Sequence, residues 1–326
     1  MTNHFARRLT NSPVMAASKD DKGAIVRALE SEIKGVTTDL KKEVNYQLFN
    51  DGTAVRGLVN GDPGAGGTET TITLDNPGTN YINDGMKIDF LNPTGGAVRT
   101  YGDSLTVSTV DSSTELTLSA VLNASNTIAD NDYVTREDAT DQAGTSYEMM
   151  GLKGIVDDGT YVTTLHNLSR TSYEWWKCST FSTDDNSGTN RDLTLDLMQS
   201  AITAVEKNGG KVNLILTTFD LRDAYAALVV ADKRFVNTLE LDGGFKGLEY
   251  SGIPLVADVD CPPNTMFFLD TSHLQIMQMS DWDWMDRDGA TLSRVANSDA
   301  YEAVLYWYAD LATDKPRAFS FLRDVA

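Results

Sequence analysis

The first regular pattern in the chain is a narrow apolar stripe with helical spacing. Its members recur at steps of three or four residues: Ile25, Leu29, Ile33, Val36, Leu40, Val44 and Leu48. Charged residues occupy many of the positions between them, so the spacing predicts an amphipathic helix that ends near residues 49–52. A stripe this narrow buries too little surface to be stable alone. We therefore expect the helix to dock on something, either in the same subunit or in the next one.

Residues 62–137 change to the alternating pattern of short β-strands. Thr70, Ile72 and Leu74 alternate in one segment, and similar alternation marks residues 86–90, 105–109 and 116–118. Turn signals such as Asn76-Pro-Gly78 and Asp111-Ser-Ser113 separate these segments. The pattern predicts a small antiparallel sheet or barrel, inserted into the rest of the chain.

The remainder of the chain mixes helices and strands. Leu193, Leu197, Ala201 and Val205 step by four and predict a helix over residues 191–208. Short apolar strands are expected at 212–216, 252–256 and 265–269, and an alternating strand at 274–279. Residues 301–308 are apolar on both faces, so we expect both faces of that strand to be covered. Residues 317–322 are expected to return beside it, and the whole predicts an α+β architecture.

Composition narrows the class of function. The chain has 326 residues and a formal net charge of −20, which argues against open nucleic-acid binding through phosphate contacts. The charge is uneven, because residues 1–61 carry 9 basic and 7 acidic groups whereas residues 62–137 carry 3 and 11. No stretch approaches the length of a membrane helix, and the first residues lack the apolar core of a secretory signal. Cys178 and Cys261 are expected to be buried free thiols in a reducing compartment.

No motif in the sequence predicts catalysis, a metal or a cofactor. His4, His166 and His273 lack zinc-ligand spacing. Residues 61–67 are glycine-rich but lack the Lys-Ser/Thr ending of a phosphate loop. Residues 281–289 are acidic, yet in every register a Met or Trp falls on an EF-hand ligand position. We therefore expect no catalytic, cofactor-binding or metal-binding residues, and a protein that is not an enzyme.

The order of these elements resembles the major capsid proteins of tailed bacteriophages, which have the Hong Kong 97 (HK97) fold. The resemblance covers residues 22–60 and 138–326 and includes the segment Gly243-Gly-Phe-Lys-Gly-Leu-Glu-Tyr-Ser-Gly-Ile-Pro-Leu255. It implies an HK97-like α+β fold with an added small all-β domain. The implied parts are an N-terminal arm at 1–61, the β insertion at 62–137, an extended loop and connection at 138–190, a peripheral domain at 191–216 and 274–312 with 191–208 as its spine helix, and an axial domain at 217–273 and 313–326.

The resemblance also implies a function and partners. The chain would assemble with copies of itself, as hexamers and pentamers, into an icosahedral head that encloses double-stranded DNA without sequence-specific binding. Portal and scaffold or decoration proteins would be further partners, and no membrane would be. The protein would reside in the virion after assembly in the host cytoplasm. The expected contacts between subunits are Ile25, Leu29, Ile33, Leu40, Val44, Trp175 and Trp176.

Other functions remain open at this point. A tail or decoration protein would form tubes or trimers instead of closed shells, and an encapsulin-like compartment would share the shell fold. An enzyme with a carboxylate site that follows no motif would show a pH-dependent activity.

Overall fold

The computed structural model describes residues 2–11, 22–63, 69–75, 77–94, 96–99, 102–122, 128–141, 145–182, 190–231, 239–241, 245–286, 289, 291, 293–294 and 300–326. The chain divides into two compact units. The small unit is Gly52–Glu148, and the large unit joins Met1–Asp51 to Met149–Ala326.

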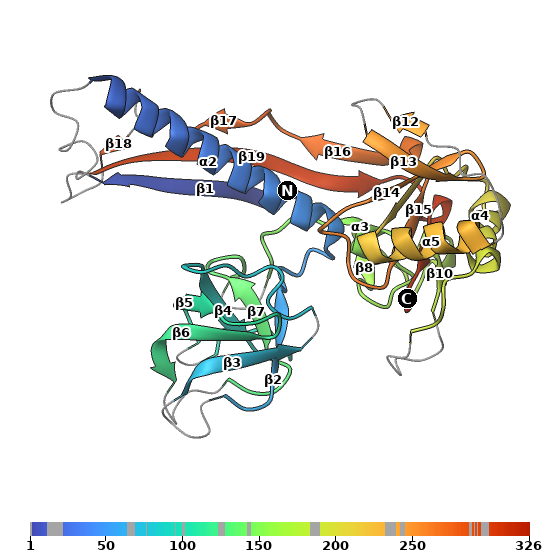
Figure 1. Ribbon diagram of the computed structural model, residues 1–326, viewed down its shortest axis with the longest axis horizontal. Coiled ribbons are helices and arrows are strands. Elements are labelled where there is room, and N and C mark those ends of the chain that lie inside the picture. The colour runs from blue at the N-terminus through green and yellow to red at the C-terminus, as the bar shows by residue number, and fades with distance from the viewer. Residues whose placement is uncertain are drawn as a thin grey trace. The chain divides into compact units, whose positions relative to one another are not determined.

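The small unit is a closed antiparallel β-barrel (Figure 1). Its strands close in the order β2-β3-β6-β5-β4-β7 and are β2 (Gly57–Asn60), β3 (Glu69–Asp75), β4 (Lys87–Leu91), β5 (Leu105–Val110), β6 (Glu115–Leu122) and β7 (Tyr133–Arg136). The alternating apolar residues of the four predicted strands point inward, and Ile72, Ile88, Phe90 and Val107 are fully buried. Closure leaves no unpaired sheet edge in this unit, so its barrel needs no partner strand.

The boundary of the insertion differs from the expected 62–137. Strand β2 precedes residue 62, yet it pairs with β3 through Leu58↔Asp75 and with β7 through Leu58↔Tyr133. Val59 is fully buried in the barrel. Strands β2 and β7 have four residues each, which is too short for alternation to stand out in the sequence. The expected arm at 1–61 therefore includes a strand of the barrel.

One buried carboxylate gives the barrel a pH-dependent stability. Asp89 accepts hydrogen bonds from the backbone N–H groups of Ser104 (2.7 Å) and Asp138 (3.1 Å), yet burial raises its pKa above the ordinary value of 3.8. A raised pKa means that the folded state holds the proton more tightly, so this stabilisation is lost as pH rises through the folded-state pKa. Asp89→Asn removes the titration. We expect the difference in unfolding free energy between wild type and Asp89→Asn to fall as pH rises from 4 to 7, and urea titrations that show it rising would contradict this.

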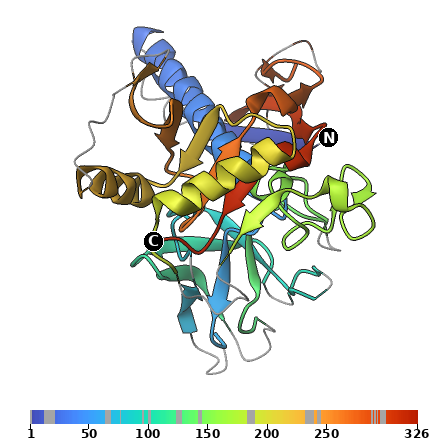
Figure 2. The same cartoon turned by 90° about the vertical axis from the view of Figure 1, so that its right-hand side faces the viewer.

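A seven-stranded sheet forms one half of the large unit. Its order is β10-β20-β15-β11-β14-β13-β12, and its strands are β10 (Ser179–Phe181), β20 (Ser320–Leu322), β15 (Met266–Leu269), β11 (Leu214–Thr217), β14 (Ile253–Ala257), β13 (Phe245–Tyr250) and β12 (Leu239–Leu241). Helices α4 (Leu195–Lys207) and α5 (Phe219–Ala231) share one core with Met266 and Phe268 of β15. Figure 2 views this end of the chain, with α4 in yellow in front of the strands.

The opposite face of this sheet is covered by residues 149–181. Phe267 and Leu269 of β15 face this layer, in which Ile155, Leu165 and Trp176 are buried. The layer contains the short helix α3 (Leu152–Ile155), the hairpin of β8 (Thr164–Leu165) and β9 (Leu168–Ser169), and the 3-10 turn η1 (Glu174–Trp176). The expected extended loop at 138–190 is therefore wrong for this stretch, because its apolar side chains pack in the core.

A second sheet is built around the long strand β19 (Ala300–Thr313). Strand β1 (Thr2–Asn11) pairs along one edge of β19, and β16 (Leu274–Gln278), β17 (Asp283–Trp284) and β18 (Ser293–Arg294) pair in succession along the other. Helix α2 (Lys22–Phe49) lies along β1 and β19 (Figure 1). Its residues Val36, Leu40 and Val44 pack with Leu305 and Trp307 of β19. The part of the apolar stripe from Val36 to Val44 thus docks within its own chain.

Two expected domain assignments do not match the packing. Helix α4, expected as the spine of the peripheral domain, shares its core with α5 and with Leu255, both expected in the axial domain. Residues 274–312, expected beside α4, instead form the sheet on which α2 packs. Residues 320–322 were expected beside β19 but pair with β10 and β15. A return beside β19 was wrong because one edge of that strand is taken by β1 and the other by β16, β17 and β18.

Candidate assembly surfaces

The seven residues expected at contacts between subunits fall into three groups. Leu40 and Val44 are buried against β19, and Trp176 is buried in the layer below the seven-stranded sheet, with its indole Nε1 donating to the Leu165 carbonyl at 3.0 Å. For these three the expectation is wrong, since their apolar surface is already covered by their own chain. Ile33 and Trp175 are exposed at 40% and 48%. The side chains of Ile25 and Leu29 lie outside the described residues.

Two exposed aromatic residues, Tyr173 and Trp175, form a small cluster with the buried Trp176 after the β8–β9 hairpin. The ring centroids of Tyr173 and Trp175 lie 5.7 Å apart, and those of Trp175 and Trp176 lie 5.4 Å apart. His166 and Asn167 form the hairpin turn with positive φ angles of 49° and 64°. The His166 Nε2 atom accepts a hydrogen bond from the Thr313 N–H at 3.3 Å, and burial lowers the pKa of His166 despite the opposing charge of Asp310. The neutral ring thus ties the hairpin to the end of β19.

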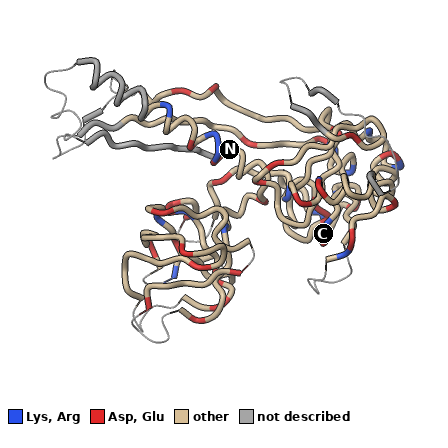
Figure 3. The backbone as a smooth tube through the Cα atoms, in the orientation of Figure 1, with Lys and Arg blue, Asp and Glu red and all other residues tan. Residues whose placement is uncertain are grey.

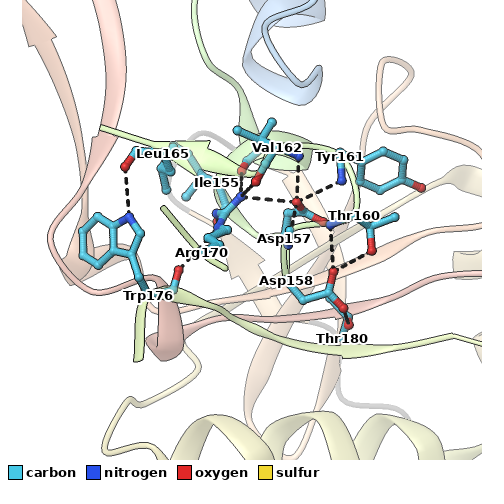
Figure 4. A network of polar contacts seen from close by, with 12 residues as sticks. Ile155, Asp157, Asp158, Thr160, Tyr161, Val162, Leu165, Arg170, Trp176 and Thr180 are labelled. Carbon is cyan, nitrogen blue, oxygen red and sulfur yellow. Dashed lines mark hydrogen bonds and ion pairs between the residues drawn. The ribbon is translucent and has the colours of Figure 1, made fainter. Parts of the chain in front are cut away.

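A fully buried arginine holds the layer that carries this cluster (Figure 4). Arg170 Nη1 donates to the carbonyls of Gly154 and Val162, both at 2.9 Å, and Nη2 donates to the Ile155 carbonyl at 2.7 Å. Its Nε donates to the Trp176 carbonyl at 3.3 Å. One guanidinium therefore fixes α3, the hairpin and the 3-10 turn relative to one another, which its five-donor fork makes possible.

Asp157 completes this network as the counter-ion. Its Oδ2 atom lies 3.3 Å from Arg170 Nη1, and both side chains are fully buried. The same oxygen accepts from the backbone N–H groups of Gly159 (3.0 Å), Tyr161 (3.0 Å) and Val162 (2.9 Å). The adjacent Asp158 accepts hydrogen bonds from Thr160 and Thr180. Burial alone would raise the pKa of Asp158, but these hydrogen bonds and the charge of Arg323 outweigh it, so the pKa lies below its ordinary value. The arrangement positions the backbone of residues 157–162.

The two cysteines of the large unit lie in surroundings that suppress their reactivity. Cys178 and Cys261 are buried free thiols, as expected. Burial raises the pKa of Cys261 to about 12 and that of Cys178 well above its usual range, so neither forms a thiolate nucleophile near neutral pH. Among the described residues, no group of three or more His, Cys, Asp or Glu side chains is placed to hold a metal ion. Within the same residues, no helix is long and apolar enough to span a membrane.

Comparison with known families decides what kind of protein these surfaces belong to. Residues 131–309 match the family described as SU10 major capsid protein, which is more than half of the chain. The chain belongs to the SU10 major capsid protein family. The matched segment runs from the last strand of the barrel into β19, and the resemblance to phage major capsid proteins noted from the sequence is confirmed.

Solved structures that the chain partly matches include chains of phage capsids and of an encapsulin. A chain of the cyanophage A-1(L) capsid asymmetric unit is 20% identical with a TM-score of 0.44, covering 56% of this chain and 60% of that one. A chain of the satellite phage P4 procapsid is 9% identical with a TM-score of 0.40, covering 100% and 71%. The holo-SrpI encapsulin of Synechococcus elongatus PCC 7942 is 13% identical with a TM-score of 0.36, covering 45% and 53%. The match thus spans about half to three fifths of the cyanophage and encapsulin chains. No curated protein matches the chain.

Family membership supports both the expected fold and the expected function. A mixed α+β chain with a small inserted barrel in a major capsid protein family agrees with the expected HK97-like fold with an inserted domain. The family is one of structural capsid proteins, and its members are located in the virion capsid.

The Arg170–Asp157 network was not predicted from the sequence, because neither residue stands in a recognisable motif. Only the burial of both side chains identifies it.

Proposed function

We propose that this chain is the repeating subunit of a closed phage head, in which copies form hexamers and pentamers around packaged double-stranded DNA. The family match over residues 131–309 carries this proposal. The structure also supports it, because the large unit exposes apolar side chains that could contact other copies, among them Trp175, Met277 and Met279. Closed shells need many modest contacts of this sort, repeated by symmetry.

The proposal includes partners and a place of assembly. Portal protein would occupy one vertex, and scaffold or decoration proteins would act during or after closure. The net charge of −20 favours enclosure of DNA over tight binding to it, since an acidic shell repels the polymer. Assembly in the host cytoplasm fits the two buried free thiols. The subunit would have no catalytic role.

Expression of the chain alone, followed by sedimentation and negative-stain electron microscopy, tests this proposal. We expect closed spherical particles with hexamer and pentamer units, because the contacts reside in the subunit. Tubes or isolated trimers would instead indicate a tail or decoration protein. Closed particles that enclose a protein cargo in place of DNA, when purified from a producing host, would indicate an encapsulin-like compartment. Persistent monomers in the presence and absence of scaffold would refute a shell role.

A further inference from the structure

The sheet around β19 has a helix on one face and an exposed surface on the other. Leu305, Trp307 and Ala309 face α2. Their neighbours Tyr306 and Tyr308 face the opposite side and are half-buried, with ring centroids 5.4 Å apart. The sequence predicts cover on both faces, yet among the described residues of this sheet only the α2 side belongs to an apolar core. The opposite face is therefore a candidate for contact with another molecule.

Strands β16 and β17 give this face a defined chemistry. Met277 pairs with Asp310, the Met279 N–H donates to the Tyr308 carbonyl, and Asp283 pairs with Tyr306, so all three lie on the face away from α2. Met277 and Met279 are 49% and 70% exposed, and Asp281 and Asp283 are exposed as well. Asp281 lies in the turn between β16 and β17, where it accepts a hydrogen bond from Gln278 Nε2 at 3.1 Å. We call Met277, Met279, Asp281 and Asp283 the sheet patch. It combines flexible apolar side chains with two carboxylates that form no ion pair among the described residues.

One flank of α2 is complementary to the sheet patch. Lys34 and Lys41 lie two turns apart on this flank, and Ile33 adjoins Lys34 at the edge of the apolar stripe. All three are exposed, and neither lysine forms an ion pair with a described residue. We call Ile33, Lys34 and Lys41 the helix patch. Figure 3 shows basic positions on α2 and acidic positions along the β16–β17 segment.

The helix patch cannot meet Met277, Met279 or Asp283 within one chain, because α2 packs on one face of the sheet and these three residues lie on the other. We infer that the helix patch of one subunit docks on the sheet patch of the next copy. Ile33 would contact the two methionines, while Lys34 and Lys41 would pair with Asp281 and Asp283. This contact joins two different surfaces, so it is heterologous and its repetition can close a ring. The inference rests on the proposed function and names one of the interfaces that it requires.

Charge reversal tests this contact directly. Lys34→Glu/Lys41→Glu would place like charges opposite each other and is expected to lower the yield of closed particles about tenfold or more. Asp281→Lys/Asp283→Lys is expected to do the same. The four substitutions combined restore opposite charges across the contact and are expected to recover most of the wild-type yield. Lys207→Glu/Lys211→Glu changes two exposed lysines away from both patches by the same net charge and serves as the matched control.

The readouts separate this inference from its alternatives. Circular dichroism and thermal midpoints confirm that each variant is folded, and sedimentation with microscopy measures particle yield. A wild-type particle yield from Lys34→Glu/Lys41→Glu would overturn the inference. If those particles also contained less DNA than wild-type particles, the lysines would face the packaged DNA and not a neighbouring subunit. Failure of the combined variant to recover would overturn it too. Failure of the wild type itself to form particles would instead count against the proposed function.

Discussion

Arg170→Met is expected to lower the free energy of unfolding of the large unit by about 3–5 kcal/mol. The methionine fills much of the space of the arginine stem but cannot donate hydrogen bonds. The substitution leaves the buried carboxylate of Asp157 without its counter-ion, and it leaves the carbonyls of Gly154, Ile155 and Val162 without their guanidinium donor. Buried groups that lose their partners carry the full cost of desolvation. Urea unfolding, followed by tryptophan fluorescence, measures the loss.

A matched control tests whether the loss of stability comes from the burial of the Arg170–Asp157 pair or from the loss of any ion pair. Lys177 pairs with Glu174 at 2.7 Å, but the Glu174 side chain is 84% exposed. Lys177→Met removes an ion pair by the same chemistry and is expected to cost less than about 1 kcal/mol. Equal losses from Arg170→Met and Lys177→Met would show that the buried network contributes no more than a surface pair. Arg170→Met/Asp157→Asn is expected to recover part of the loss, since it removes the uncompensated charge.

Periodicity predicted the elements whose burial is local and regular. The stripe of α2, the four alternating strands of the barrel and the short apolar strand β15 all appear where their spacing predicts them. A period indicates which side of an element is buried, because side-chain direction follows directly from backbone geometry. It does not indicate what covers that side. Leu40 and Val44 were therefore expected at a neighbouring subunit, whereas they pack on β19 of their own chain.

The features that the sequence did not reveal depend on distant partners. Strand β20 pairs with β15 and β10 instead of β19, and the register of such pairings depends on residues far apart in the chain. Residues 149–181 lack a sustained period because polar bonds to backbone, more than a repeating apolar face, hold them together. Arg170, whose hydrogen bonds connect these segments, is a residue type that is rarely buried without a partner. Its role becomes visible only when the four accepting carbonyls and Asp157 are in place.

Removing residues 1–51 is expected to unfold the large unit, whereas removing residues 52–148 is expected to leave it folded. Truncation deletes Val36, Leu40, Val44 and Phe49, all buried in cores of the large unit. Each buried side chain of this size contributes about 1.5–3 kcal/mol. Their combined loss is comparable to the whole stability of a typical domain, about 5–15 kcal/mol. The segment expected from the sequence to act as an arm is thus part of the subunit core.

Excision of the barrel provides the control, because the two cut points lie close together in the large unit. The Met149 N–H donates to Gln47 Oε1 at 3.2 Å, and Lys153 Nζ lies 2.9 Å from Asp51 Oδ2. A short Gly-Ser linker can therefore join Asp51 to Met149 without stretching the chain. Circular dichroism and thermal unfolding are expected to show a cooperative transition for the excised chain and none for the truncated one. A cooperative transition in the truncated chain would show that α2 is an appendage, and its stripe would then be free to dock on another copy.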